Sequence, residues 1–114
     1  MTTMAEPAMV RFEGIAPGTE IWGGTQADFT IQAEGRTAKE AAVLLNDPAA
    51  AILAEAVGRE NTEDFRADAA KAAGTVIFER EAAHGGDIES LVMVSKAYLE
   101  THPELLERVK AAFA

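Results

Sequence analysis

A chain of 114 residues has room for one domain built around one hydrophobic core. It contains no cysteine, which excludes disulfides, thiolate zinc sites, iron–sulfur ligation and cysteine nucleophiles. Its formal net charge of −9 disfavours binding to nucleic acids and to anionic membranes, because its few Lys and Arg residues are scattered singly and form no basic patch.

The first third of the chain carries the signals of strands and turns. Residues 1–7 are small and polar and predict a loose tail. Over residues 8–35, apolar side chains alternate with polar or charged ones, which places the apolar ones on one face of each strand. These apolar residues are Val10 and Phe12, followed by Phe29, Ile31 and Ala33. We expect two or three short antiparallel strands here, whose apolar face needs helices to cover it.

Trp22 is the single Trp of the chain and stands beside Gly23-Gly24 in one of these predicted strands. In a chain with few large apolar residues, such a side chain most often anchors the core. The flanking glycines leave one face of the ring open, so the alternative is an exposed residue that binds a partner.

Helical signals begin at residue 37. Thr37 and Glu40 have the Thr-x-x-Glu spacing of a capping box, which predicts a helix over residues 38–45. Asp47, which precedes a proline, is the predicted N-cap of a second helix. Gly58 suits the end of that helix, because glycine readily adopts the left-handed conformation of a C-terminal cap.

A long third helix is predicted from Asn61 to the glycine pair Gly85-Gly86, because its apolar residues recur at helical spacing. Gly74 and the β-favouring residues that follow it support an alternative, in which this helix gives way to a strand over Thr75–Arg80.

A fourth helix is predicted after the glycine pair, with Asp87 as its cap and an unusually broad apolar face. Its main stripe comprises Ile88, Leu91, Val92, Ser95, Tyr98 and Leu99, and Met93 and Val94 widen it. A last short helix begins where Thr101 and Glu104 repeat the capping-box spacing. The predicted fold is α+β: a tail over residues 1–7 and one domain over residues 8–114, in which the short N-terminal sheet packs against four or five helices.

Glu81 and His84 have the Glu-x-x-His spacing, which places a carboxylate and an imidazole on the same face of a helix. Di-iron helical bundles use this motif twice, together with two further glutamates. Here the motif occurs once, at a predicted helix end where the helix dipole alone favours a histidine. We therefore expect no metal and no cofactor, and we keep Glu81, His84 and Asp87 as candidate catalytic residues of a small cleft.

These features favour a non-enzymatic interaction protein, such as an adaptor, an assembly factor or an inhibitor. The alternative is a small enzyme or ligand-binding domain with its cleft around Glu81, and a transcriptional or antitoxin-type regulator is disfavoured by the acidic charge. We expect a homodimer with Met93 and Val94 in its interface and Trp22 as a further binding residue. The sequence shows no secretory signal and no apolar run long enough to span a bilayer, so the expected location is the cytoplasm.

Overall fold

The computed structural model describes residues 9–19, 23–32, 37–84 and 88–113, which form a four-stranded sheet and four helices. The strands are β1 (Met9–Thr19), β2 (Gly23–Gln32), β3 (Lys39–Leu45) and β4 (Leu91–Val94). The helices are α1 (Asp47–Val57), α2 (Glu63–His84), α3 (Lys96–Thr101) and α4 (Pro103–Ala112). The α+β class is therefore as predicted, but the sheet has four strands rather than two or three, and β3 and β4 lie outside the predicted range of residues 8–35.

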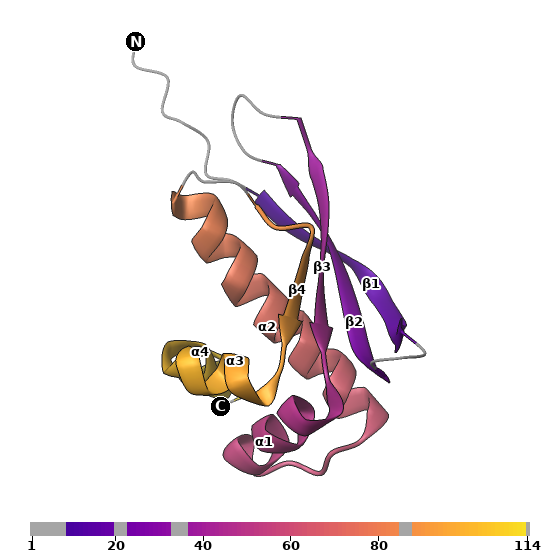
Figure 1. Cartoon of the computed structure of the whole chain (residues 1–114), viewed down its shortest axis with the longest axis vertical. Coiled ribbons are helices and arrows are strands. Elements are labelled where there is room, and N and C mark those ends of the chain that lie inside the picture. Colours follow the sequence, from indigo (N-terminus) through magenta and orange to yellow (C-terminus); the bar gives the residue numbers. More distant parts are fainter. Residues whose placement is uncertain (1–8, 20–22, 33–36, 85–87, 114) are drawn as a thin grey trace.

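The sheet has the strand order β1-β2-β3-β4 and mixed directions. β1, β2 and β3 form an antiparallel meander, whereas β4 pairs in parallel with β3 after the chain has passed through α1 and α2. In Figure 1, α2 runs alongside the sheet, and α1, α3 and α4 gather at the lower end of the view. This arrangement makes β1 and β4 the two edges of the described sheet.

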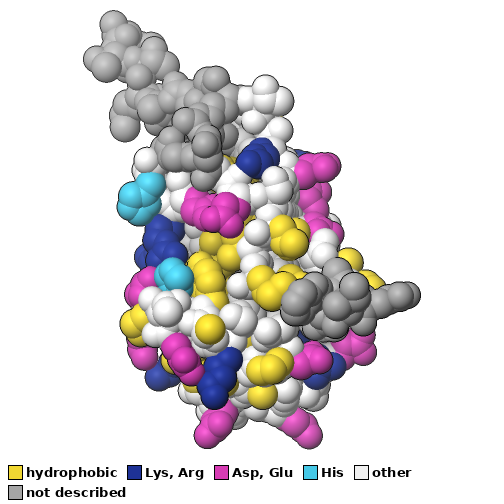
Figure 2. All heavy atoms as spheres, in the orientation of Figure 1, with side chains coloured by type: hydrophobic (Ala, Val, Ile, Leu, Met, Phe, Trp, Pro, Cys, Tyr) yellow, Lys and Arg dark blue, Asp and Glu magenta, His cyan; other side chains and the backbone are white. Residues whose placement is uncertain are grey.

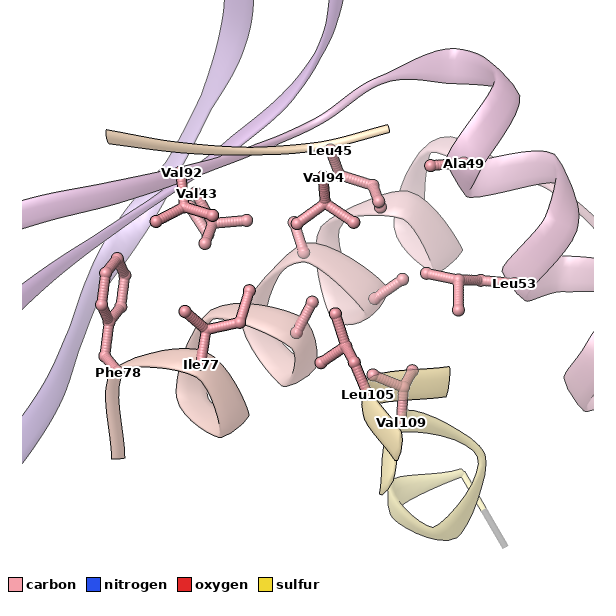
Figure 3. Close-up of a cluster of buried hydrophobic side chains, with 14 of the residues drawn as sticks. Val43, Leu45, Ala49, Leu53, Ile77, Phe78, Val92, Val94, Leu105 and Val109 are labelled. Carbon is pink, nitrogen blue, oxygen red and sulfur yellow. The ribbon is translucent and has the colours of Figure 1, made fainter. Parts of the chain in front are cut away.

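The hydrophobic core lies between one face of the sheet and the helices. On β2, the buried residues Ala27, Phe29 and Ile31 alternate with more exposed ones, as in an antiparallel strand that has one face against helices. Figure 3 shows how side chains of β3 and β4 meet those of the helices in this core. The labelled sheet residues are Val43, Leu45, Val92 and Val94, and they face Ile77 and Phe78 of α2, Leu53 of α1, and Leu105 and Val109 of α4.

Helix α2 and the sheet approach each other closely at Gly74, in the middle of the helix. A Cβ atom at this position would lie 2.3 Å from Cε1 of Phe29 and 2.6 Å from its Cζ. The Phe29 ring is also packed edge-on against Phe12 and Phe78, with ring centroids 5.6 Å and 5.4 Å away. Glycine is therefore required here for close packing, and α2 continues through it without interruption.

The prediction of one long third helix is confirmed, because α2 is helical through residues 75–80 and ends at His84. Its first turn is capped by Thr62, whose hydroxyl accepts a hydrogen bond of 3.0 Å from the amide of Phe65. Gly58 ends α1 in the left-handed conformation, with a φ of 71°, as predicted. The N-cap of α1 is Asn46 rather than Asp47, because the Asn46 side chain accepts the hydrogen bond from the backbone.

The helix predicted over residues 38–45 is wrong: this segment is strand β3. Its five consecutive residues from Ala41 to Leu45 are all buried, and the strand pairs with β2 on one side and with β4 on the other. The sequence of such a central strand is a continuous apolar run. Its apolar residues therefore show neither helical spacing nor the alternation of a strand that has one exposed face. The Thr-x-x-Glu spacing before it is therefore coincidental.

The helix predicted over residues 88–99 is also wrong. Leu91–Val94 is strand β4, and the helix begins only at Lys96, with Ser95 as its N-cap. The β-branched residues Val92 and Val94 favour the strand, and parallel pairing with β3 buries both of them. Asp87, the predicted cap, lies outside the described residues.

The last helix starts near the predicted position, at Pro103, but without the predicted capping box. The Thr101 hydroxyl lies 3.1 Å from the carbonyl oxygens of both Ala97 and Tyr98, so it donates back into α3. His102 occupies the N-cap position of α4 and makes no capping hydrogen bond with its side chain.

Candidate functional site

The sheet has a second face that points away from the helices, which we call the outer face. Residues that pair across neighbouring strands project on the same side of a sheet, so the strand register identifies its members. None of them belongs to the core cluster between sheet and helices. On the described strands they include Arg11, Gln26, Asp28, Thr30, Glu40, Ala42, Leu44, Leu91 and Met93.

One half of the outer face is acidic and forms a shallow hollow. It is lined by the carboxylates of Glu13, Asp28 and Glu40 together with smaller side chains, among them Ala42 and Ser90. Glu13 joins this group because the register of β1 shifts between Phe12 and Gly14, which makes Glu13 the extra residue of a β-bulge.

Two of these carboxylates already have polar partners. Arg11 Nε donates to Glu13 Oε1 over 2.7 Å, and this contact, with a second hydrogen bond from Thr30, lowers the pKa of Glu13. Gln26 Nε2 donates to Asp28 Oδ1, also over 2.7 Å. The hydrogen bonds from Arg11 and Gln26 therefore hold two of the three carboxylates of the hollow in place on the sheet.

The other half of the outer face is apolar and lies over β3 and β4. Ala42 and Leu44 are buried, while Met93 is half-buried and 51% of the Leu91 surface is exposed. In Figure 2, apolar side chains are visible in the part of the molecule where Figure 1 places β4. The accessible apolar surface on this half of the outer face is therefore centred on the edge strand.

The free edge of β4 presents backbone hydrogen-bonding groups. The amides of Ala42 and Asn46 donate to the carbonyls of Ser90 and Val94, so alternate residues of this segment turn their backbone toward β3. Leu91 and Met93, between them, turn their N–H and C=O groups to the opposite side, where the described sheet has no further strand. β4 contains neither a charged residue nor a proline, the usual devices that protect an edge strand.

A pair of carboxylates stands at the beginning of β4. One oxygen of Glu81, on α2, is buried and has no hydrogen-bond partner in the described part of the chain. Burial raises the pKa of Glu81, and the nearby negative charge of Glu89 raises it further, whereas a hydrogen bond from the Glu89 backbone lowers it. Lys39 approaches the same region, where its ammonium group donates to the carbonyl of Ile88.

Of the three residues of the predicted cleft, the structure describes Glu81 and His84, which have separate polar neighbours. His84 is exposed, and its Nδ1 lies 2.7 Å from the Arg80 carbonyl of its own helix, while Glu81 is turned toward Glu89. Asp87 and Trp22 lie outside the described residues. Across the four described segments, no group of three or more His, Asp or Glu side chains is arranged to hold a metal ion.

The two predicted interface residues fall on opposite faces of β4. Met93 lies on the outer face, next to Leu44 in the strand register. Val94 is completely buried in the core, so its side chain is not available to a partner. Asp28 was not among the predicted site residues, although the alternation through Ala27, Phe29 and Ile31 assigns it to the side of the sheet opposite the core.

Comparisons with models of protein families, with curated proteins and with solved structures gave no match to this chain. None of the described helices combines the length and the apolar character needed to cross a membrane. The expected cytoplasmic location stays a prediction.

Proposed function

We propose that this protein is a protein-interaction module, of the adaptor or assembly-factor kind, that binds its partner at β4. The observation that carries the proposal is an edge strand whose outward backbone groups at Leu91 and Met93 have no described strand beside them, while Leu91 exposes half of its surface. A single exposed leucine is ordinary on a protein surface. An unprotected apolar edge, in contrast, is the feature to which partners add a strand.

The acidic half of the outer face supports the same proposal. Protein interfaces place apolar contacts at the centre and polar groups around them. Here the apolar part over β3 and β4 is bordered by the hollow of Glu13, Asp28 and Glu40. These charges would steer a partner and fix its orientation more than they would add to its affinity.

The proposal is tested by photo-crosslinking in the cells that make the protein. A benzophenone amino acid replaces Leu91 in one variant, and in a control variant it replaces Glu63, which is exposed at the beginning of α2. We expect a discrete adduct of defined mass from position 91, and none of that mass from position 63. The same smear from both positions, or no adduct from position 91, would contradict the proposal.

A further inference from the structure

We propose that the partner at β4 is a second copy of this chain, whose own β4 pairs antiparallel with the first about a two-fold axis. In this dimer, Lys96 of each copy reaches the carboxylates of Glu81 and Glu89 in the other. The inference rests on the proposed function, because it names the occupant of the same edge.

The sequence around β4 is self-complementary for antiparallel pairing. Residues 89–96 read Glu-Ser-Leu-Val-Met-Val-Ser-Lys, with an acid at one end, a base at the other, a serine inside each, and four apolar residues between them. Antiparallel pairing of two identical segments places the beginning of one beside the end of the other. In the register set by the backbone, Lys96 of each copy lies opposite Ile88 of the other, one residue from Glu89, and both charged side chains are exposed.

The backbone geometry also selects an antiparallel pairing, whose centre lies half a residue from the centre of the 89–96 segment. Antiparallel strands exchange two hydrogen bonds between residues that both turn their backbone toward the partner strand. On the free edge of β4 these residues are Leu91 and Met93. When Leu91 of one copy lies opposite Met93 of the other, the outward N–H and C=O groups of both residues form hydrogen bonds. The two-fold axis then passes at Val92, and the contact is isologous, as is typical of dimers. The side chains of Leu91 and Met93 then meet on one continuous outer face.

Among the described residues, no base forms an ion pair with the carboxylates of Glu81 and Glu89 at the beginning of β4. Of the two bases that act on Glu81, Lys39 donates to the carbonyl of Ile88, and Arg80 forms an ion pair of 2.8 Å with Glu104. Lys96 of a second copy would therefore meet two carboxylates that form no ion pair with a described base. The net charge of −9 per chain opposes self-association. Two copies are therefore expected to meet where opposite charges face each other, as they do at the ends of β4.

The test is sedimentation velocity over a concentration series, with charge reversals at both ends of β4. We expect the wild-type chain to dimerise, and Glu89→Lys and Lys96→Glu each to weaken the dimer by about tenfold or more, because each places like charges together. An equimolar mixture of the two variants should restore a dimer of one chain of each kind, since both of its contacts between positions 89 and 96 are again between opposite charges. Glu63→Lys, the same reversal at an exposed site on α2, should leave the dimer unchanged.

A double variant, Glu89→Lys with Lys96→Glu, guards against a single reversal that disturbs folding. It should dimerise with itself, because the complementary pair is present in reversed order. A wild-type chain that is monomeric at every concentration would overturn the inference, as would a dimer that is indifferent to both reversals or a mixture that fails to associate. If the Leu91 crosslink then forms with a different protein, the second copy is excluded while the proposed function stands.

Discussion

Replacing Gly74 by alanine tests the packing of α2 against the sheet. The new methyl group would lie 2.3 Å and 2.6 Å from two carbons of the Phe29 ring. This ring is 1% exposed and packs edge-on against Phe12 and Phe78, so moving it would disturb both of these contacts. Forcing an extra carbon into such a core costs about 1–3 kcal/mol.

The same substitution also improves the helix. Alanine is about 1 kcal/mol more favourable than glycine in a helix interior, which offsets part of the packing cost. The net prediction for Gly74→Ala is a loss of about 1 kcal/mol in the free energy of unfolding, which is measured by urea denaturation at 25 °C.

Two controls separate the packing cost from the gain in helix propensity. Gly14→Ala adds a methyl group where no atom lies within 4 Å, and it should be neutral or slightly stabilising. In a Phe29→Leu background, which removes the two ring carbons nearest to the new methyl group, Gly74→Ala should become stabilising. A Gly74→Ala protein that is more stable than the wild type by the full helix gain would refute the description of this contact.

Three further predictions concern other parts of the chain. Because the folded state raises the pKa of Glu81, that state binds the proton more tightly than the unfolded chain, and stability falls as the pH rises from 4.5 through the folded pKa. Glu81→Gln should flatten this fall in urea melts over a pH series, whereas Glu79→Gln, at an exposed position of the same helix, should not. Ser95→Ala should lower the free energy of unfolding by about 1 kcal/mol through loss of the α3 N-cap, and Thr37→Ala, which precedes a strand, should leave it unchanged. Val94→Glu should unfold the protein in thermal melts, since it places an unpaired carboxylate in the core.

The sequence predicted the helices that carry their own local signals. α1 and α2 begin at polar capping residues, and α1 ends at Gly58. The strands β3 and β4 have no comparable signal, because they are strands through their pairing with each other, and the 45 residues 46–90 separate them in the chain. A short apolar run such as Ala41–Leu45 is compatible with a buried helix or a buried strand, and tertiary pairing decides between them.

The wrong prediction of a helix over residues 88–99 is also the reason that the candidate site at β4 was not predicted. Reading residues 88–99 as a helix placed Met93 and Val94 together on one surface. In a strand, neighbouring side chains point to opposite faces, so Met93 lies on the outer face and Val94 in the core. The broad helix face from which the homodimer was predicted therefore does not exist. The homodimer is now proposed because the edge of strand β4 is open.

Amide hydrogen exchange at Leu91 and Met93, measured over a series of protein concentrations, tests the role of the β4 edge most directly. If two copies pair along β4, both outward-facing amides should become protected as the concentration rises. The amides of Val92 and Val94 face β3 and should be protected at every concentration, and those on the free edge of β1 should not change. Exchange at Leu91 and Met93 that stays fast and independent of concentration would contradict pairing of the chain with itself at β4.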